Sequence, residues 1–175
     1  MAGYIQKTLI KFQHPTPQNL EDSTLKVYPK EYGEKAQFTK EEDGTPELSA
    51  ASIRILQQRI GILLFYGRSV DMTLMVALST LASGQGYGIE TMARAMILLS
   101  NYCATHPEPV IRYKKSDIII EIQSDASYLY NPKVHSRAGR HFFLMDNPKR
   151  GQPIMINGSV HVVYTIIRNV MSLAA

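Results

Sequence analysis

The residues of this sequence best suited to chemistry are polar side chains spaced along one short apolar segment. Between residues 118 and 125, one set of alternate positions holds Ile118, Ile120 and Ile122, and the other holds Glu121, Gln123 and Asp125. Because alternate side chains of a strand share a face, the pattern predicts a buried strand with one apolar and one polar face. Asp125 then stands at the polar end of the strand, where a carboxylate can bind a divalent metal ion. We take it as the candidate catalytic and metal-binding residue.

Two simpler interpretations compete with this one. Aspartate often begins a turn, so Asp125 with Ala126 and Ser127 also fits the start of a loop. Glu121 is better explained as a solvated residue on the sheet face than as a second ligand. His135 and His141 offer a proton donor or a metal ligand, but no cysteine or acidic cluster completes a site around them, which favours packing.

Basic residues point to a nucleic-acid partner. The formal net charge is +4, from 19 lysines and arginines against 15 acidic residues. We expect phosphate contacts from Lys114, Lys115, Arg137 and Arg140. The same role suits Lys7, Lys11 and Arg112.

Helices are expected in the first two thirds of the chain. One is predicted between residues 2 and 14, where His14 to Pro17 ends it. After an irregular stretch from Gln18 to Leu48, three more are predicted. Ser49 caps the first and Asp71 the second, which ends at Ser83 to Gly86; the third runs from Ile89 to Ala104. The glycines between 84 and 88 follow a helix rather than a strand, which indicates a turn and not a phosphate-binding loop.

Strands are expected after Pro109, so the fold class is α+β. Val110 to Tyr113 and Ile118 to Asp125 form a predicted hairpin about a turn at Lys114 to Asp117, and the loop Ser136 to Gly139 leads into a partner strand from Gly139 to Leu144. Turns are predicted at Asn147 to Gly151 and at Asn157-Gly158. A strand holding Val160, Val162 and Tyr164 follows, and Ile166 to Ala175 begins a helix. A sheet of this size without covering helices is expected to be marginally stable.

Composition limits the class of protein. Hydrophobic residues make up 45% of the 175, as in ordinary globular chains. The single cysteine, Cys103, excludes an internal disulfide and a zinc site made of several cysteines, and we expect it in the core. With no long apolar run and no leader, we expect a soluble, intracellular chain, cytoplasmic or nuclear, without a membrane partner.

Several segments, taken in order, resemble one family. They are Ala2 to Lys7, Phe12 to Pro15, Gly61 to Tyr66, Asn101 to Pro107, Ser124 to Leu129 and Asn157-Gly158 with Val170 to Ser172. In this order the chain resembles the Pol polyprotein of copia-like retrotransposons, in which reverse transcriptase leads through a connecting region into ribonuclease H. The resemblance implies three parts: residues 1–48 as a thumb-like helix and irregular linker, 49–108 as a helical connection, and 109–175 as the N-terminal part of a ribonuclease H-like domain.

The resemblance also implies a chemistry that this chain holds only in part. The family copies RNA into DNA and cleaves RNA:DNA hybrids with Mg²⁺, and Asp125 would be the first acid of the nuclease. The second acid would follow Ala175, and the paired aspartates of the polymerase are missing from the sequence. Because two-metal cleavage needs several carboxylates, we expect an inactive fragment that binds no Mg²⁺ tightly. Leu173 and Arg140 also depart from the small residues usual in the family.

Partners and alternatives follow from this interpretation. The expected partners are an RNA:DNA hybrid or another nucleic acid, bound weakly, and the remainder of the Pol polyprotein. The alternative is a non-catalytic nucleic-acid-binding fragment, or a relic without a selected function. Salt-dependent binding without cleavage favours the alternative of a binding fragment.

Overall fold

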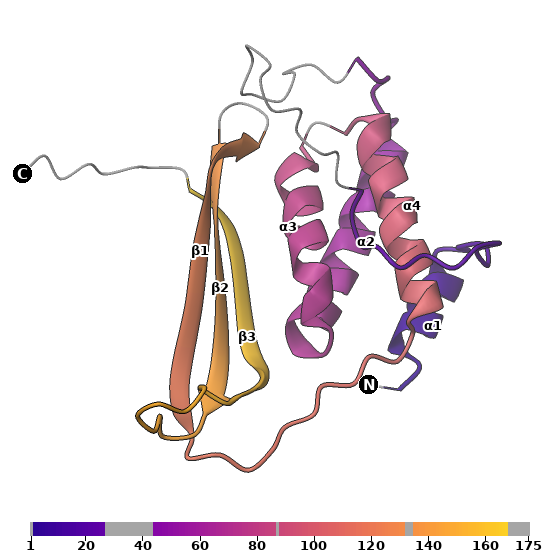
Figure 1. Cartoon of the computed structure of the whole chain (residues 1–175). Coiled ribbons are helices and arrows are strands. Elements are labelled where there is room, and N and C mark those ends of the chain that lie inside the picture. The colour runs from indigo at the N-terminus through magenta and orange to yellow at the C-terminus, as the bar shows by residue number, and fades with distance from the viewer. Residues whose placement is uncertain (1, 27–43, 87, 132–134, 168–175) are drawn as a thin grey trace, which may run out of the picture. The chain divides into compact units, whose positions relative to one another are not determined.

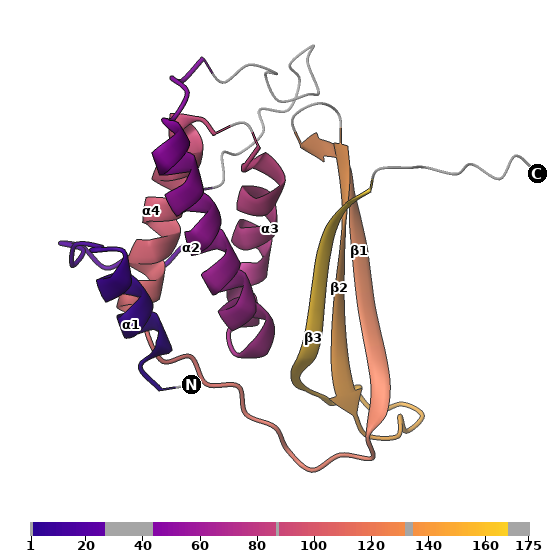
Figure 2. The same cartoon turned by 180° about the vertical axis from the view of Figure 1, so that it is seen from behind.

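Over the residues that the structure describes, the chain folds into four α-helices and a three-stranded antiparallel sheet, so its class is α+β, as predicted. The structure, a computed structural model, describes residues 2–26, 44–86, 88–131 and 135–167. For the described residues between 127 and 136 it describes the backbone only. Figures 1 and 2 show the order of the elements along the chain. Among the described residues, a helical unit holds 2–26 and 44–113, and a sheet unit begins at Lys114.

The helices of the helical unit match the predicted ones closely. They are α1 (Tyr4–Lys11), α2 (Ala50–Ser69), the short 3-10 helix η1 (Met72–Leu74), α3 (Met75–Gly84) and α4 (Glu90–Thr105). The Ser49 hydroxyl accepts a hydrogen bond from the Ser52 N–H at 3.2 Å, and the Asp71 carboxylate accepts one from the Thr73 N–H at 3.2 Å. Both predicted caps are therefore confirmed. No helix in the described ranges has the length and apolar character needed to cross a membrane.

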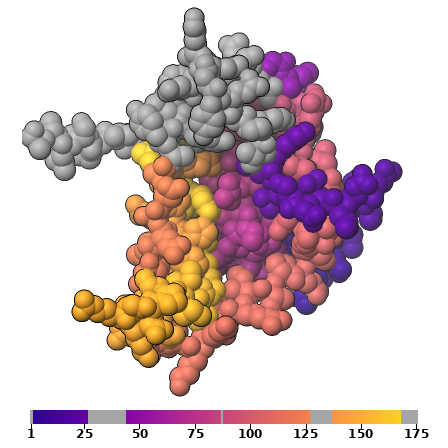
Figure 3. Space-filling model, in the orientation of Figure 1, coloured from indigo at the N-terminus to yellow at the C-terminus, as the bar shows by residue number. Residues whose placement is uncertain are grey.

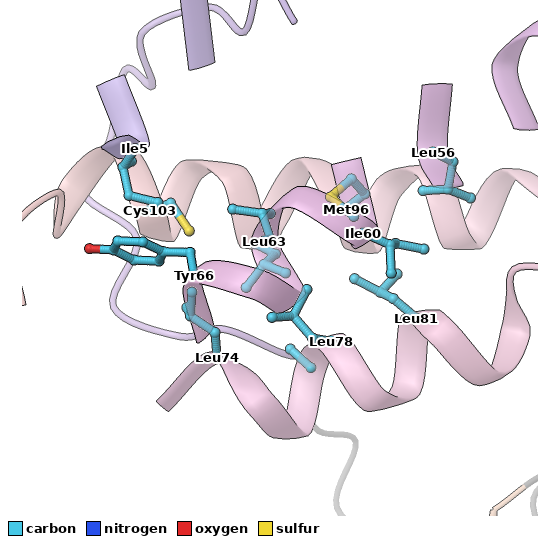
Figure 4. Packing of buried hydrophobic residues seen from close by; sticks show 12 residues of the cluster. Ile5, Leu56, Ile60, Leu63, Tyr66, Leu74, Leu78, Leu81, Met96 and Cys103 are labelled. Carbon is cyan, nitrogen blue, oxygen red and sulfur yellow. The ribbon is translucent and has the colours of Figure 1, made fainter. Parts of the chain in front are cut away.

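One apolar core joins all four helices (Figure 4). Its members include Ile5 of α1, Ile60 and Leu63 of α2, Leu78 and Leu81 of α3, and Met96, Leu99 and Cys103 of α4. Cys103 is 2% exposed, so the prediction that it packs in the core is confirmed. Since α1 contributes Ile5 to this core, the first helix and residues 49–108 belong to the same packed unit.

Polar contacts fix the end of α1 on the other helices. The side chain of Arg59 donates from Nη2 to the Phe12 carbonyl at 2.8 Å. His14 Nε2 and Asn101 Oδ1 lie 2.8 Å apart in a hydrogen bond. These contacts place the residues that follow α1 directly against α2 and α4.

The sheet unit is a meander of three long strands. β1 (Ile119–Asn131) pairs with β2 (His135–Met145), which pairs with β3 (Ile156–Ile167), so β2 is central. Both pairings are antiparallel. The predicted hairpin partnership between the segment of Asp125 and that of Gly139 to Leu144 is confirmed, with Asp125 directly opposite Gly139.

The beginning of the sheet differs from the prediction. Val110 to Tyr113 form no strand, and Lys114 to Asp117 are not a hairpin turn. Ile118 has a positive φ of 59°, and β1 begins immediately after it. Val110 to Tyr113 have the composition of a strand, but a strand needs a neighbour for its backbone hydrogen bonds, and no described segment pairs with them.

Three further expectations about the sheet were wrong. Ser136 to Gly139 lie inside β2 and are not a loop, because their backbone pairs with both neighbouring strands. Asn157-Gly158 is not a turn between strands but part of β3, near two irregularities in its pairing with β2. Ile166 and Ile167 end β3 and begin no helix; the remainder of that prediction, with Leu173, lies outside the described residues. The turn after β2 is confirmed by a hydrogen bond from Gln152 N–H to the Lys149 carbonyl.

Candidate functional site

Asp125 lies within β1 and not at its end. The strand continues to Asn131, so neither a strand-end ligand nor the start of a loop describes this residue. Its side chain is exposed, and Oδ1 accepts a hydrogen bond of 2.8 Å from the N–H of Ala126. The carboxylate is open to solvent along its strand.

The strand that carries Asp125 is also not buried, contrary to the prediction. The isoleucines predicted to be buried are largely exposed: Ile120 by 64% and Ile122 by 52% in β1, and Ile118, just before it, by 72%. Among the described strands β1 lies at an edge of the sheet, and the isoleucine face of β1 is left open to solvent. Alternation along a strand separates two faces, but it does not say which face is covered.

The face of the sheet that carries Asp125 is polar along β1, as the alternation predicts, but it also holds Phe143 and the buried Val162. Glu121 lies opposite Phe143, Gln123 opposite His141 and Asp125 opposite Gly139, and directly opposed residues share a face. On β3, the residues opposite His141 and Gly139 are Val162 and Tyr164. The polar side chains of this face are Glu121, Gln123, Asp125, His141 and Tyr164. Both outer strands and the central strand contribute to it.

A contact between β2 and β3 determines the packing of this face. His141 Nε2 and the Tyr164 hydroxyl form a hydrogen bond of 2.6 Å, and the His141 ring stacks on Phe143 with ring centres 5.9 Å apart. The tyrosine ring lies against Gly139: a Cβ there would be 2.7 Å from Tyr164 Cε1. Burial raises the pKa of Tyr164. Sequence reasoning missed this residue, although a glycine inside a strand is a signal of close approach by another group.

Asp125 alone does not fit a pair of divalent ions. Glu121, the other carboxylate of β1 on this face, lies four residues away, about 14 Å along a strand. The described residues hold no group of three histidine, cysteine, aspartate or glutamate side chains that would bind a metal ion. His141 is held by Tyr164, and for His135 only the pairing of its backbone with Asn131 is described. The described side chains around Asp125 therefore do not fit a two-magnesium site.

The predicted phosphate-binding residues do not gather in one place. Arg137 and Arg140 are three residues apart on β2, so they project from opposite faces of the sheet. Arg140 is exposed in the middle of the strand, where no tight turn exists for it to disturb. Arg137 is half-buried, and burial lowers its pKa. Lys114 and Lys115 are exposed and precede β1.

A small hollow lies between α1, α2 and α4, lined by Ile5, Phe12, His14, Arg59 and Cys103 among others. Burial lowers the pKa of His14. Burial, helped by the Asp71 carboxylate, raises the pKa of Cys103 to about 12, so its thiol stays protonated at neutral pH and is a poor nucleophile. The hollow is therefore a packing feature of the helical core and not a site for covalent chemistry.

Comparison of the chain with protein-family models, with curated proteins and with solved structures finds no match. A functional assignment therefore depends on the residues and geometry described above. The feature that bears most directly on function is the exposed Asp125 on β1, the first strand of the antiparallel sheet.

Proposed function

We propose that the chain is a fragment of a retrotransposon reverse transcriptase and ribonuclease H protein. In this proposal residues 1–48 are the thumb-like end of the reverse transcriptase, residues 49–108 are its helical connection, and residues 109–175 are the N-terminal part of a ribonuclease H-like domain. The order of the family-like segments along the sequence supports the proposal. The observation that carries it is the β1–β2–β3 meander, with the exposed Asp125 on its first strand.

The proposed part of Asp125 is that of one acidic ligand in a larger set. In phosphodiester cleavage by two metal ions, carboxylates hold ions that activate water and stabilise the leaving oxygen. Asp125 is the one carboxylate that the family resemblance assigns to that task here, so this chain alone should bind a hybrid without cleaving it. The negative charge of Asp125 should still be felt by a phosphate placed nearby.

The test compares hybrid binding by the unchanged chain and by Asp125→Asn, first without divalent metal. Removing a carboxylate about 6 Å from a phosphate in water removes a repulsion of about 0.7 kcal/mol, so affinity should rise about threefold. Adding Mg²⁺ should reduce this difference, because the cation screens the same repulsion. Glu121→Gln is the matched control: it removes one charge from the same face and strand, about 14 Å away.

The outcomes separate the parts of the proposal. Equal effects of Asp125→Asn and Glu121→Gln would contradict a special position of Asp125 beside the hybrid. Magnesium-dependent cleavage that is lost in Asp125→Asn would overturn the claim of inactivity. Failure of the unchanged chain to bind any hybrid would overturn the proposal as a whole.

The second candidate function is a non-catalytic nucleic-acid-binding fragment. It is favoured by the exposure of Lys114, Lys115 and Arg140, whose charges need no metal and no acid to contact phosphates. Salt-dependent binding of the hybrid, with no effect of Asp125→Asn, would support this candidate. No salt-dependent binding at all would be expected of a relic without a selected function.

A further inference from the structure

Four exposed basic side chains lie at the end of the sheet where β1 begins. Lys114 and Lys115 stand before β1, and Lys149 and Arg150 belong to the segment that joins β2 to β3. Both views of the chain show this segment beside the start of β1, and Figure 3 shows it forming a projection of the surface. We call these four side chains the basic end. Lys149 and Arg150 did not enter the sequence-based set of phosphate-binding residues.

Hydrogen bonds hold the two segments of the basic end together. The Asn157 side chain accepts from Lys114 N–H at 2.7 Å and donates to the Lys114 carbonyl at 2.5 Å. Asp117 accepts from Asn147 N–H at 2.9 Å, and Asp146 accepts from Asp117 N–H at 3.3 Å. Lys114 and the segment carrying Lys149 are thus fixed to the same end of the sheet, 30 or more residues apart in sequence.

The charges of the basic end are free to meet an external anion. Among the described residues, neither ion pair of the chain involves any of the four basic side chains. The two nearby carboxylates, Asp117 and Asp146, already accept hydrogen bonds from backbone N–H groups. The four cations face solvent and outnumber these two carboxylates, which leaves a net positive surface.

We propose that the basic end binds the phosphate backbone of a duplex nucleic acid. Lysine contributes point charges and arginine a planar fork, and both suit phosphate oxygens. Such contacts position a duplex without reading its sequence. The choice of a nucleic acid as the polyanion rests on the proposed function, whereas the surface itself rests on geometry and charge alone.

An anionic membrane is the competing partner. Ile154 and Met155 are 54% and 64% exposed on the same segment, and basic residues beside apolar ones can bind lipid surfaces. These apolar residues lie in an irregular segment and form no amphipathic helix, which favours the nucleic acid. Vesicles therefore enter the test as a separate arm.

The test measures binding of the full chain to a labelled RNA:DNA hybrid between 50 and 200 mM salt. Four phosphate contacts predict a loss of affinity of about 150-fold over this range. Replacing Lys149→Gln together with Arg150→Gln should reduce that loss to about 12-fold. The matched control, Arg54→Gln with Arg68→Gln, removes two exposed charges from α2 and should leave the loss unchanged.

A further variant tests the arrangement rather than the charge. Asn157→Ala keeps all four basic side chains but removes the hydrogen bonds to Lys114, and it should weaken hybrid binding at 100 mM salt. Circular dichroism checks that Asn157→Ala retains the sheet. If the sheet is lost, the test depends on the double glutamine variant alone, because that variant alters only exposed side chains.

Three results would overturn the proposal. The first is an equal salt-dependent loss of hybrid affinity in the double glutamine variant and in its control. The second is hybrid binding that does not depend on salt. The third is binding to vesicles with 30% phosphatidylserine without binding to the hybrid. Because none of these readouts uses cleavage or Asp125, the basic end can be confirmed even if the proposed nuclease origin fails.

Discussion

Replacing Gly139 by alanine tests how Tyr164 packs on the central strand. A methyl group at residue 139 would lie 2.7 Å from Cε1 and 3.1 Å from Cδ1 of the Tyr164 ring. The ring cannot withdraw without straining its 2.6 Å hydrogen bond to His141. Overpacking costs about 1–3 kcal/mol, and loss of the hydrogen bond costs about 1 kcal/mol. Alanine also lowers the backbone entropy of the unfolded chain, which offsets about 0.5–1 kcal/mol of this cost. We expect Gly139→Ala to destabilise the sheet by about 2 kcal/mol.

Native-state hydrogen exchange of the β2 amides measures this loss in the sheet unit separately from the helices. A loss of about 2 kcal/mol speeds exchange by about 30-fold. In a Tyr164→Ala background the same substitution should be neutral or slightly stabilising, since the ring is gone. Gly61→Ala in α2 is the control: apart from neighbouring backbone of its own helix, nothing lies within 4 Å of the added Cβ, so the higher helix propensity of alanine should stabilise the chain. Equal acceleration by Gly139→Ala in both backgrounds would refute the steric argument.

Three further predictions concern the helical unit. Leu78→Ala removes a fully buried side chain and should cost about 2–5 kcal/mol in urea unfolding, whereas Ile97→Ala, at a position 49% exposed, should change stability by about 0.5 kcal/mol. Asp71→Ala removes the acceptor for the Thr73 N–H and should cost about 1–2 kcal/mol in thermal unfolding, and Asp71→Asn should recover part of it. Because burial raises the pKa of Cys103 to about 12 and the unfolded thiol ionises near about 8.5, stability should fall as pH rises from about 8.5 towards 12. At pH 9, iodoacetamide should label this thiol in urea but not in the native chain; equal rates would contradict its burial.

The helices were predictable because their signals are local. Ser49 and Asp71 each satisfy a backbone N–H within three residues, and apolar side chains recur at helical spacing through α2, α3 and α4. The position of α1 in the same core was not predictable. It depends on contacts such as His14 with Asn101, which are 87 residues apart and leave no mark in the local pattern.

The sheet and the candidate site were predictable only in part, because strands depend on their partners. The alternation of Glu121 with its neighbours correctly separated two faces, but an edge position and an exposed Asp125 follow from which strands adjoin β1. Val110 to Tyr113 are rich in strand-forming residues and yet pair with nothing described. The role of Asn157 is similarly non-local: it resembles a turn residue, but its amide binds the backbone of Lys114, 43 residues away.

The docking of α1 sets an order of events during synthesis. Ile5 is 1% exposed in the folded helical unit, beside Leu63 and Cys103, so its burial is complete only after α4 has been made. His14 must wait for Asn101, 87 residues later, which takes about 4–17 s at the usual rate of translation. During that interval the apolar side of α1 remains available to chaperones or to other nascent chains. The described strands pair with neighbours in sequence and face no comparable delay, so α1 is more exposed to misassembly than the sheet.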